Sequence, residues 1–217
     1  NMYLTKKSDA AGFLIANIST NIANAILNST AASITELSAK GKSAYSTSIT
    51  LVATKTTDNL ESSNVIAILP GTDKKDEYLF LTGHYDHLGK KGNVIWYGAD
   101  DDGSGTVGVM QMAEAFAAAA KAGKKPRRTI VFMTVSGEEK GLWGSQYYSE
   151  HPIFPLDKTT ADLNTDMIGR VDTERTTADS LNYVYVIGHD KLSSDLPIIN
   201  EAANKEYDEN DRAICLY

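Results

Sequence analysis

The chain has 217 residues, of which 42% are hydrophobic and 23% are charged, the balance of an ordinary globular protein with one or two domains. Its formal net charge of −7 argues against a nucleic-acid partner, because phosphate binding needs a basic surface. The single cysteine excludes a disulfide within the chain and a zinc site built from cysteines. No apolar run approaches the ~20 residues of a membrane span.

Residues 1–45 differ from the rest, because they are rich in Ala, Ser, Thr and Asn. A weak apolar stripe predicts one helix over residues 20–37. We expect this region to be the end of a separate or inserted domain. The chain opens with Asn1-Met2 and shows no signal peptide, and we expect it to be a piece of a longer protein.

From residue 46 onwards, predicted strands and helices alternate along the chain. The strands are expected at 47–54, 64–69, 78–82, 129–135, 161–167 and 183–187, and the helices at 103–122, 142–148 and 196–207. Such alternation predicts a three-layer α/β sandwich over residues 46–217, with a mixed, mostly parallel central sheet between helices. Ligands bind such sheets beyond the carboxyl ends of the strands.

Metal-binding side chains follow several of these strand ends. They are His84 and Asp86, the pair Glu138-Glu139, Asp166, and the acidic loop Asp100–Asp102 that opens the long helix. Carboxylates gathered on one rim repel one another unless a cation lies among them. One imidazole and several carboxylates, without cysteine, suit Zn²⁺ in a catalytic site. Two such ions need a bridging carboxylate, and pairs of this kind promote hydrolysis.

Each motif taken alone has a simpler interpretation. His84 could be a buried structural histidine, the two glutamates a solvated pair, and the acidic loop a calcium loop or a helix cap made by Asp102. Asp86 lies two residues after His84, so it shares a strand face with it and can accept a hydrogen bond from the ring nitrogen that does not bind metal. The combination at several strand ends favours a metal site.

Four segments together resemble the active-site segments of the M28 family of metallopeptidases, in the order of that family. They are GHYDHLG (83–89), GADDDGSG (98–105), SGEEKGLWGS (136–145) and LNTDMIGR (163–170). The resemblance extends over roughly residues 64–187. It implies a zinc-exopeptidase-like fold and peptide substrates.

The resemblance also implies a role for each matching residue. His84 and Asp166 would bind one zinc, Glu139 would bind the second, and Asp101 would bridge both. Glu138 would be the general base, and Asp86 would orient His84. By the same resemblance, the peptide bond between Asp101 and Asp102 is expected to be cis.

One feature of the family is missing from this sequence. The family has a further His ligand downstream of the position of Asp166, usually in a Ser-Asp-His context, and no Ser-Asp-His occurs here. Among the other histidines, His189 follows a predicted strand and is the first candidate for a substitute ligand, whereas His87 is expected at the rim of the site. We expect a chain truncated at its C-terminus, with the second zinc weakly held or absent.

The function implied by the resemblance is removal of N-terminal residues from peptides at a two-zinc site. Two alternatives stay open: a single-zinc acyltransferase like glutaminyl cyclase, and a family member that lost its chemistry and acts as a binding domain. Mn²⁺ or Co²⁺ could replace zinc in a site of this composition. The resemblance further implies a periplasmic or extracellular location.

Overall fold

A computed structural model describes residues 17–39, 48, 50, 56, 58–176, 183–207 and 215–216. The chain divides into two compact units, residues 1–59 and residues 60–217. The predicted strand 47–54 falls almost entirely outside the described residues. A domain boundary near residue 45 stays a prediction.

The first unit contains two short helices, α1 (Thr20–Leu27) and α2 (Ile34–Ala39), where one helix was predicted over 20–37. The first helix ends because Asn28 adopts a left-handed conformation with φ 48°. The second begins with a new cap, since Ser33 Oγ accepts from the Glu36 amide and the Glu36 carboxylate accepts from the Ala32 amide. The pattern Ser-x-x-Glu is a helix-start signal, and it explains why the single helix was wrong.

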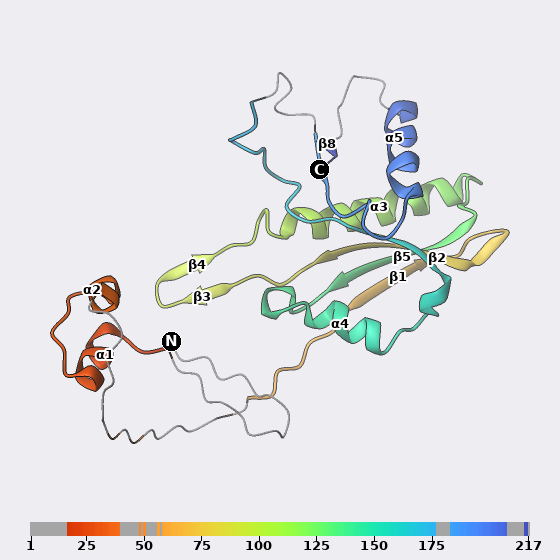
Figure 1. Cartoon of the computed structure of the whole chain (residues 1–217). Coiled ribbons are helices and arrows are strands. Elements are labelled where there is room, and N and C mark those ends of the chain that lie inside the picture. The colour runs from red at the N-terminus through yellow and green to blue at the C-terminus, as the bar shows by residue number, and fades with distance from the viewer. Residues whose placement is uncertain are drawn as a thin grey trace. The chain divides into compact units, whose positions relative to one another are not determined.

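The second unit is built on a four-stranded sheet (Figure 1). In spatial order the strands are β1 (Val65–Leu69), β5 (Arg128–Val135), β2 (Lys74–His84) and β6 (Thr159–Asn164). β2 runs parallel to both β5 and β6, and β1 is antiparallel to β5. The sheet is therefore mixed and mostly parallel, as predicted.

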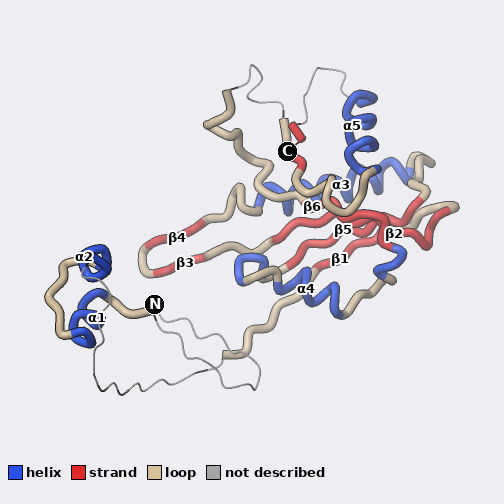
Figure 2. Tube along the Cα trace, viewed as in Figure 1, coloured by secondary structure: helices blue, strands red, loops and turns tan. Residues whose placement is uncertain are grey.

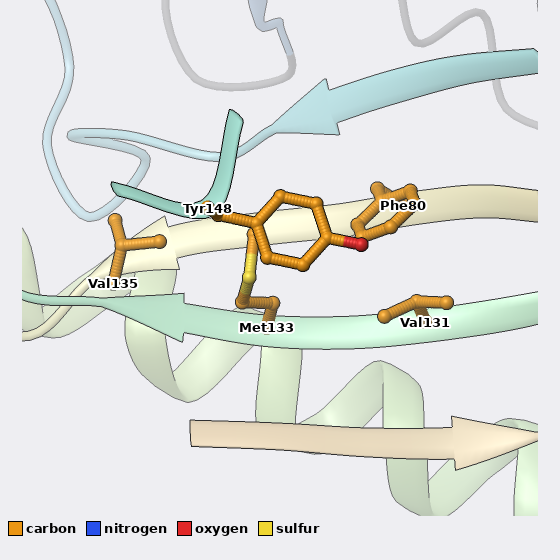
Figure 3. Close-up of a cluster of buried hydrophobic side chains, with 5 residues drawn as sticks. All are labelled: Phe80, Val131, Met133, Val135 and Tyr148. Atoms are coloured by element: carbon orange, nitrogen blue, oxygen red, sulfur yellow. The ribbon is translucent and has the colours of Figure 1, made fainter. Parts of the chain in front are cut away.

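Both faces of β5 are buried, which explains its continuous apolar sequence. On one face Val131, Met133 and Val135 pack with Phe80 and Tyr148 (Figure 3). The opposite face carries a second apolar cluster of Leu81, Val109, Ile130 and Phe132. Tyr148 belongs to helix α4 (Trp143–Glu150) and Val109 to helix α3 (Gly103–Lys121), so the two helices cover opposite faces of the sheet. The predicted three-layer sandwich is confirmed.

Several smaller elements differ from the prediction. The segment after β2, predicted as a loop, forms a hairpin of β3 (Gly89–Lys91) and β4 (Val94–Trp96). Its two-residue turn, Gly92-Asn93, has a positive φ at Gly92, which is a hairpin signal in the sequence. The predicted strand 183–187 shrinks to β7 (Tyr185–Val186), which pairs with β8 (Cys215–Leu216) and not with the central sheet.

The remaining elements are helical (Figure 2). Helix α5 spans Asp195–Tyr207, close to the predicted range, and two short 3₁₀ turns, η1 (Glu138–Lys140) and η2 (Leu156–Lys158), follow β5 and α4 respectively. β6 ends at Asn164, three residues earlier than predicted. In the part of the chain described, no helix combines the length and the apolar character needed to cross a bilayer.

Candidate metal centre

The imidazole of His84 lies at the carboxyl end of β2, and the residue is only 2% exposed. Its Nδ1 is 2.9 Å from the backbone carbonyl oxygen of Asp86. Because a carbonyl oxygen can only accept, Nδ1 carries the proton of the ring and donates a hydrogen bond to that oxygen. Nε2 then keeps its lone pair, and it has no hydrogen-bond partner among the described residues. A buried ring nitrogen in this state is suited to bind a metal ion.

The carboxylate of Asp86 contacts a different partner from the one expected. Its Oδ1 lies 3.7 Å from His84 Nδ1 and instead accepts a hydrogen bond of 3.0 Å from the backbone amide of Glu138. Asp86 therefore orients His84 through its backbone carbonyl. Its side chain fixes the η1 turn that carries the two glutamates.

The carboxylate of Asp101 lies between two imidazoles. Its Oδ1 is 3.1 Å from His84 Nε2, and its Oδ2 is 3.9 Å from His87 Nδ1. The peptide bond that follows, Asp101–Asp102, is cis, as the family resemblance implied. One oxygen facing each imidazole is the arrangement that a carboxylate bridging two metal ions requires.

Asp102 has a structural role in the same loop. Its buried carboxylate caps helix α3 by accepting from the Gly105 amide at 2.9 Å, and it also accepts from the amides of His84 at 3.0 Å and Met167 at 3.3 Å. Its carboxylate lies within 4.8 Å of potential ligand atoms of His84 and Asp166. Since backbone amides already occupy both of its oxygens, we consider Asp101 the better candidate ligand.

Replacing Asp102 by asparagine should destabilise the fold by about 2 kcal/mol, because the new amide group would face a backbone N–H and leave it unsatisfied in a buried site. Urea unfolding in the presence of EDTA would measure this cost without any contribution from metal. The exposed Asp157→Asn is the matched control, with an expected change within ~0.5 kcal/mol. Equal unfolding free energies for the two variants would contradict the capping role.

The η1 turn places Glu138 and Glu139 beside the two imidazoles. Glu138 Oε2 is 3.8 Å from His84 Nε2, and Glu139 Oε1 is 2.7 Å from His87 Nδ1. The side chain of Glu138 is 33% exposed and that of Glu139 only 16%. The more accessible Glu138 carboxylate can therefore meet a substrate, while Glu139 faces into the protein.

Asp166 completes the group from the segment that follows β6, the strand next to β2. It lies two residues beyond β6, in a segment held by a 2.8 Å hydrogen bond from the Thr165 amide to the Thr82 carbonyl. Its Oδ1 is 3.9 Å from His84 Nε2. A hollow of about 170 Å³ opens beside His84, Glu138 and Asp166, which gives a ligand access to these side chains.

The crowding of carboxylates changes their affinity for protons. Burial raises the pKa of Glu138, and the negative charge of Glu139 raises it further, although His84 acts in the opposite direction. Burial likewise raises the pKa of Asp166, with the neighbouring carboxylate of Asp101 adding to the effect. These groups would ionise more readily with a cation among them, which is the charge pattern of a metal site.

The residues fit a metal centre by a second criterion, which is the state of their buried polar atoms. His84 Nε2, His87 Nδ1 and Glu139 Oε1 are all buried without a hydrogen-bond partner in the described structure. Buried polar atoms are normally satisfied, so three such atoms around one carboxylate fit a site that binds a cation. His84, with Asp166 beside it, faces Oδ1 of Asp101. His87, with Glu139 beside it, faces Oδ2.

Sequence reasoning gave His87 only a place at the rim. The structure instead brings it within 4.8 Å of ligand atoms of both Asp101 and Glu139, whereas His189, the expected substitute, belongs to neither group of potential ligands found in the described residues. The available signal was its position three residues after His84, where the chain leaves β2 and turns toward the hairpin.

The fold and this group of side chains define an α/β protein with a candidate metal centre of imidazole and carboxylate ligands. The sequence model described as Peptidase family M28 matches residues 64–210 of the 217. The chain therefore belongs to peptidase family M28, as the sequence motifs indicated.

Two relatives of this chain carry the name of a zinc metalloprotease. The chain is 35% identical over 123 residues to a "Probable zinc metalloprotease" of Pyricularia oryzae, covering 54% of this chain and 23% of the relative. It is also 35% identical over 125 residues to a protein of the same name from Pyrenophora teres f. teres, covering 55% of this chain and 25% of the relative. The chain thus spans about a quarter of the length of these relatives.

Among solved structures, an aminopeptidase from Aneurinibacillus sp. strain AM-1 is similar to this chain, with a TM-score of 0.46 and 21% sequence identity. The similarity covers 70% of this chain and 33% of the aminopeptidase chain.

Proposed function

We propose that the protein hydrolyses peptides with zinc as its cofactor and removes residues from their N-termini at a two-metal site. The observation that carries this proposal is the position of Asp101, whose two carboxylate oxygens face two different imidazoles. Next to it, Glu138 offers an accessible carboxylate that belongs to neither group of potential ligands. Family membership and the names of the relatives support the peptidase and zinc parts of the proposal.

His84, Asp101 and Asp166 would bind one ion. Asp101 and Glu139 would be two of the ligands of the other. When bound, two zinc ions would lower the pKa of a water molecule and polarise the scissile carbonyl group. Every remaining step depends on groups of the chain itself.

Glu138 is the proposed general base and then general acid. Its carboxylate would take a proton from the attacking water as the new C–O bond forms, and would then deliver it to the nitrogen of the departing amine as the peptide bond breaks. Burial is the largest cause of its raised pKa and favours the neutral form, which holds the proton between the two transfers. The hydrogen bond from its amide to Asp86 keeps the turn in place during these steps.

The proposed preference for N-termini rests on the carboxylates that line the hollow. A free α-amino group is a cation at neutral pH, and the carboxylates of Asp166 and Glu138 line the hollow that a substrate would enter. An acetylated N-terminus has no charge and would lose this contact. The extracellular or periplasmic location implied by the family resemblance stays part of the proposal.

The first experiment uses three peptides that differ only at the N-terminus: a free residue, the same residue acetylated, and a free glutamine. We expect release of the first residue from the free peptide, and turnover slower by roughly 30-fold for the acetylated one, the equivalent of ~2 kcal/mol for a lost charged contact. Mass spectrometry would identify the products. EDTA should abolish the reaction, and added Zn²⁺ should restore it.

The same peptides separate the alternatives. Loss of ammonia from the glutaminyl peptide without cleavage would identify a cyclase, and equal cleavage of the acetylated peptide would identify an endopeptidase. Zinc binding without turnover of any peptide would favour a binding domain. Each of these three results would overturn the proposed aminopeptidase activity.

A further inference from the structure

We infer that His87 is a ligand of the second metal position, which it forms together with Asp101 and Glu139. This inference rests on the proposed function, because it assigns a third protein ligand to the second ion of the same site. It replaces the sequence-based expectation that this ligand would be His189.

The ligand atoms of His87, Asp101 and Glu139 lie close enough together to share one ion. Its Nδ1 lies 2.7 Å from Glu139 Oε1 and 3.9 Å from Asp101 Oδ2. Nδ1 and Oε1 are close, yet neither has a hydrogen-bond partner, so the two atoms face each other without the alignment that a hydrogen bond needs. Zinc bonds of ~2 Å place neighbouring ligand atoms ~3.3 Å apart in a tetrahedral site. The three side chains are therefore spaced as ligands of one ion.

The loop that carries Asp101 packs against the side chain of His87. Gly98 adopts φ +65°, and a Cβ atom there would lie 2.7 Å from His87 Cβ and 2.8 Å from His87 Cγ. The carbonyl of Gly98 also accepts a hydrogen bond of 2.8 Å from the Gly103 amide at the start of α3. The backbone of this loop thus packs directly against His87, and no other residue at position 98 would allow such close contact.

The first metal position provides an independent reason to expect an ion beside Asp101. The side chain of His84 is 3% exposed, and its unpartnered Nε2 points at Asp101 Oδ1 from 3.1 Å. An ion held there would occupy one oxygen of Asp101 and leave the other, Oδ2, directed toward His87 and Glu139. The two metal positions therefore share Asp101, and the second position does not depend on exposed acidic residues alone.

Coordination through Nδ1 has a consequence that can be measured directly. The His87 ring would have to be neutral, with its proton on Nε2, whereas His84 carries its proton on Nδ1 and offers Nε2. The chain has only four histidines, so the imidazole nitrogen signals of a ¹⁵N-histidine-labelled sample can be assigned by single substitutions. On addition of Zn²⁺, the Nδ1 signal of His87 and the Nε2 signal of His84 should both move to the values of metal-bound nitrogens.

Calorimetric titration of the EDTA-stripped chain with Zn²⁺ tests the same assignment by stoichiometry. We expect two ions per chain for the wild type and one for His87→Ala. His87→Asn should also bind one, because the amide of asparagine can donate a hydrogen bond to Glu139 but is a poor zinc ligand. Two controls should keep both ions: His151→Ala, an exposed histidine stacked on Tyr147, and His189→Ala.

Each result has a defined meaning. Two ions in His87→Asn with wild-type affinity would show that His87 is only a hydrogen-bonding neighbour and would overturn the inference. A single ion in the wild type, or the loss of one ion in His189→Ala but not in His87→Ala, would overturn it as well. None of these results would affect the first metal position, whereas a wild-type chain that binds no zinc would contradict the proposed function itself.

Discussion

Replacing Glu138 by glutamine is expected to slow peptide hydrolysis by about 100- to 10,000-fold while leaving zinc binding unchanged. Glutamine has nearly the same shape but cannot accept the proton of the attacking water. Glu138 belongs to neither group of potential metal ligands, so its loss should not empty either position. Turnover of the peptide with the free N-terminus and zinc content per chain would be measured on the same sample.

Glu114→Gln is the matched control for this change, since Glu114 is exposed on helix α3. It should retain wild-type turnover. If Glu138→Gln lost zinc together with activity, Glu138 would be a metal ligand and not the proton carrier. If Glu138→Gln kept full activity, the proposed mechanism would be wrong.

Replacing Asp101 by asparagine should weaken zinc binding at both positions by at least about 100-fold and abolish hydrolysis, because both ions lose their shared carboxylate. The effect on the metal-free protein should be small or even stabilising. The substitution would remove one of several carboxylates that repel one another around Asp166 and Glu138. Thermal unfolding in EDTA and in excess Zn²⁺ would measure both effects.

The wild type should gain about 2.7 kcal/mol of stability for each bound ion at a zinc concentration 100 times the dissociation constant of that ion, and Asp101→Asn should gain almost none. Asp76→Asn, an exposed substitution at the other end of β2, should behave like the wild type. Lower stability of Asp101→Asn in EDTA would indicate damage to the fold. An undiminished stabilisation by zinc would show that Asp101 does not bridge the ions.

The elements with strong local signals were predicted close to their observed positions. Helix α3 has apolar residues at helical spacing and a helix cap at Asp102, and β5 is a continuous apolar run. β2 extends four residues before its predicted start, into the charged segment Lys74–Glu77, where Lys74 pairs with Arg128 of β5 before an irregularity in the register.

Elements with weak or conflicting local signals were predicted less well. The predicted helix over 20–37 contains Asn28 and the Ser33-x-x-Glu36 cap, and these local signals outweighed its weak apolar stripe. The antiparallel direction of β1 and the separation of β7 from the central sheet depend on pairing with distant strands. No property of those short segments could reveal it.

The sequence by itself determined the family, the α/β sandwich and the group of residues that meet at the strand ends. The family followed from the resemblance of four motifs. The grouping of the residues followed because parallel strands bring their carboxyl ends to one edge, so residues far apart in the chain gather there. The structure brings His84, Asp101, Glu138, Glu139 and Asp166 together at that edge. Their proposed roles remain to be tested by the substitutions above.

Only the tertiary structure decided which atoms face one another. It placed the carbonyl of Asp86, and not its carboxylate, on His84, and it turned His87 toward Glu139. Side-chain direction in a loop depends on contacts such as the close packing of Gly98 against His87, and these contacts arise between segments that are distant or irregular. Spacing along a sequence fixes direction within a strand or helix, where the backbone geometry repeats, but not in the turns where this site lies.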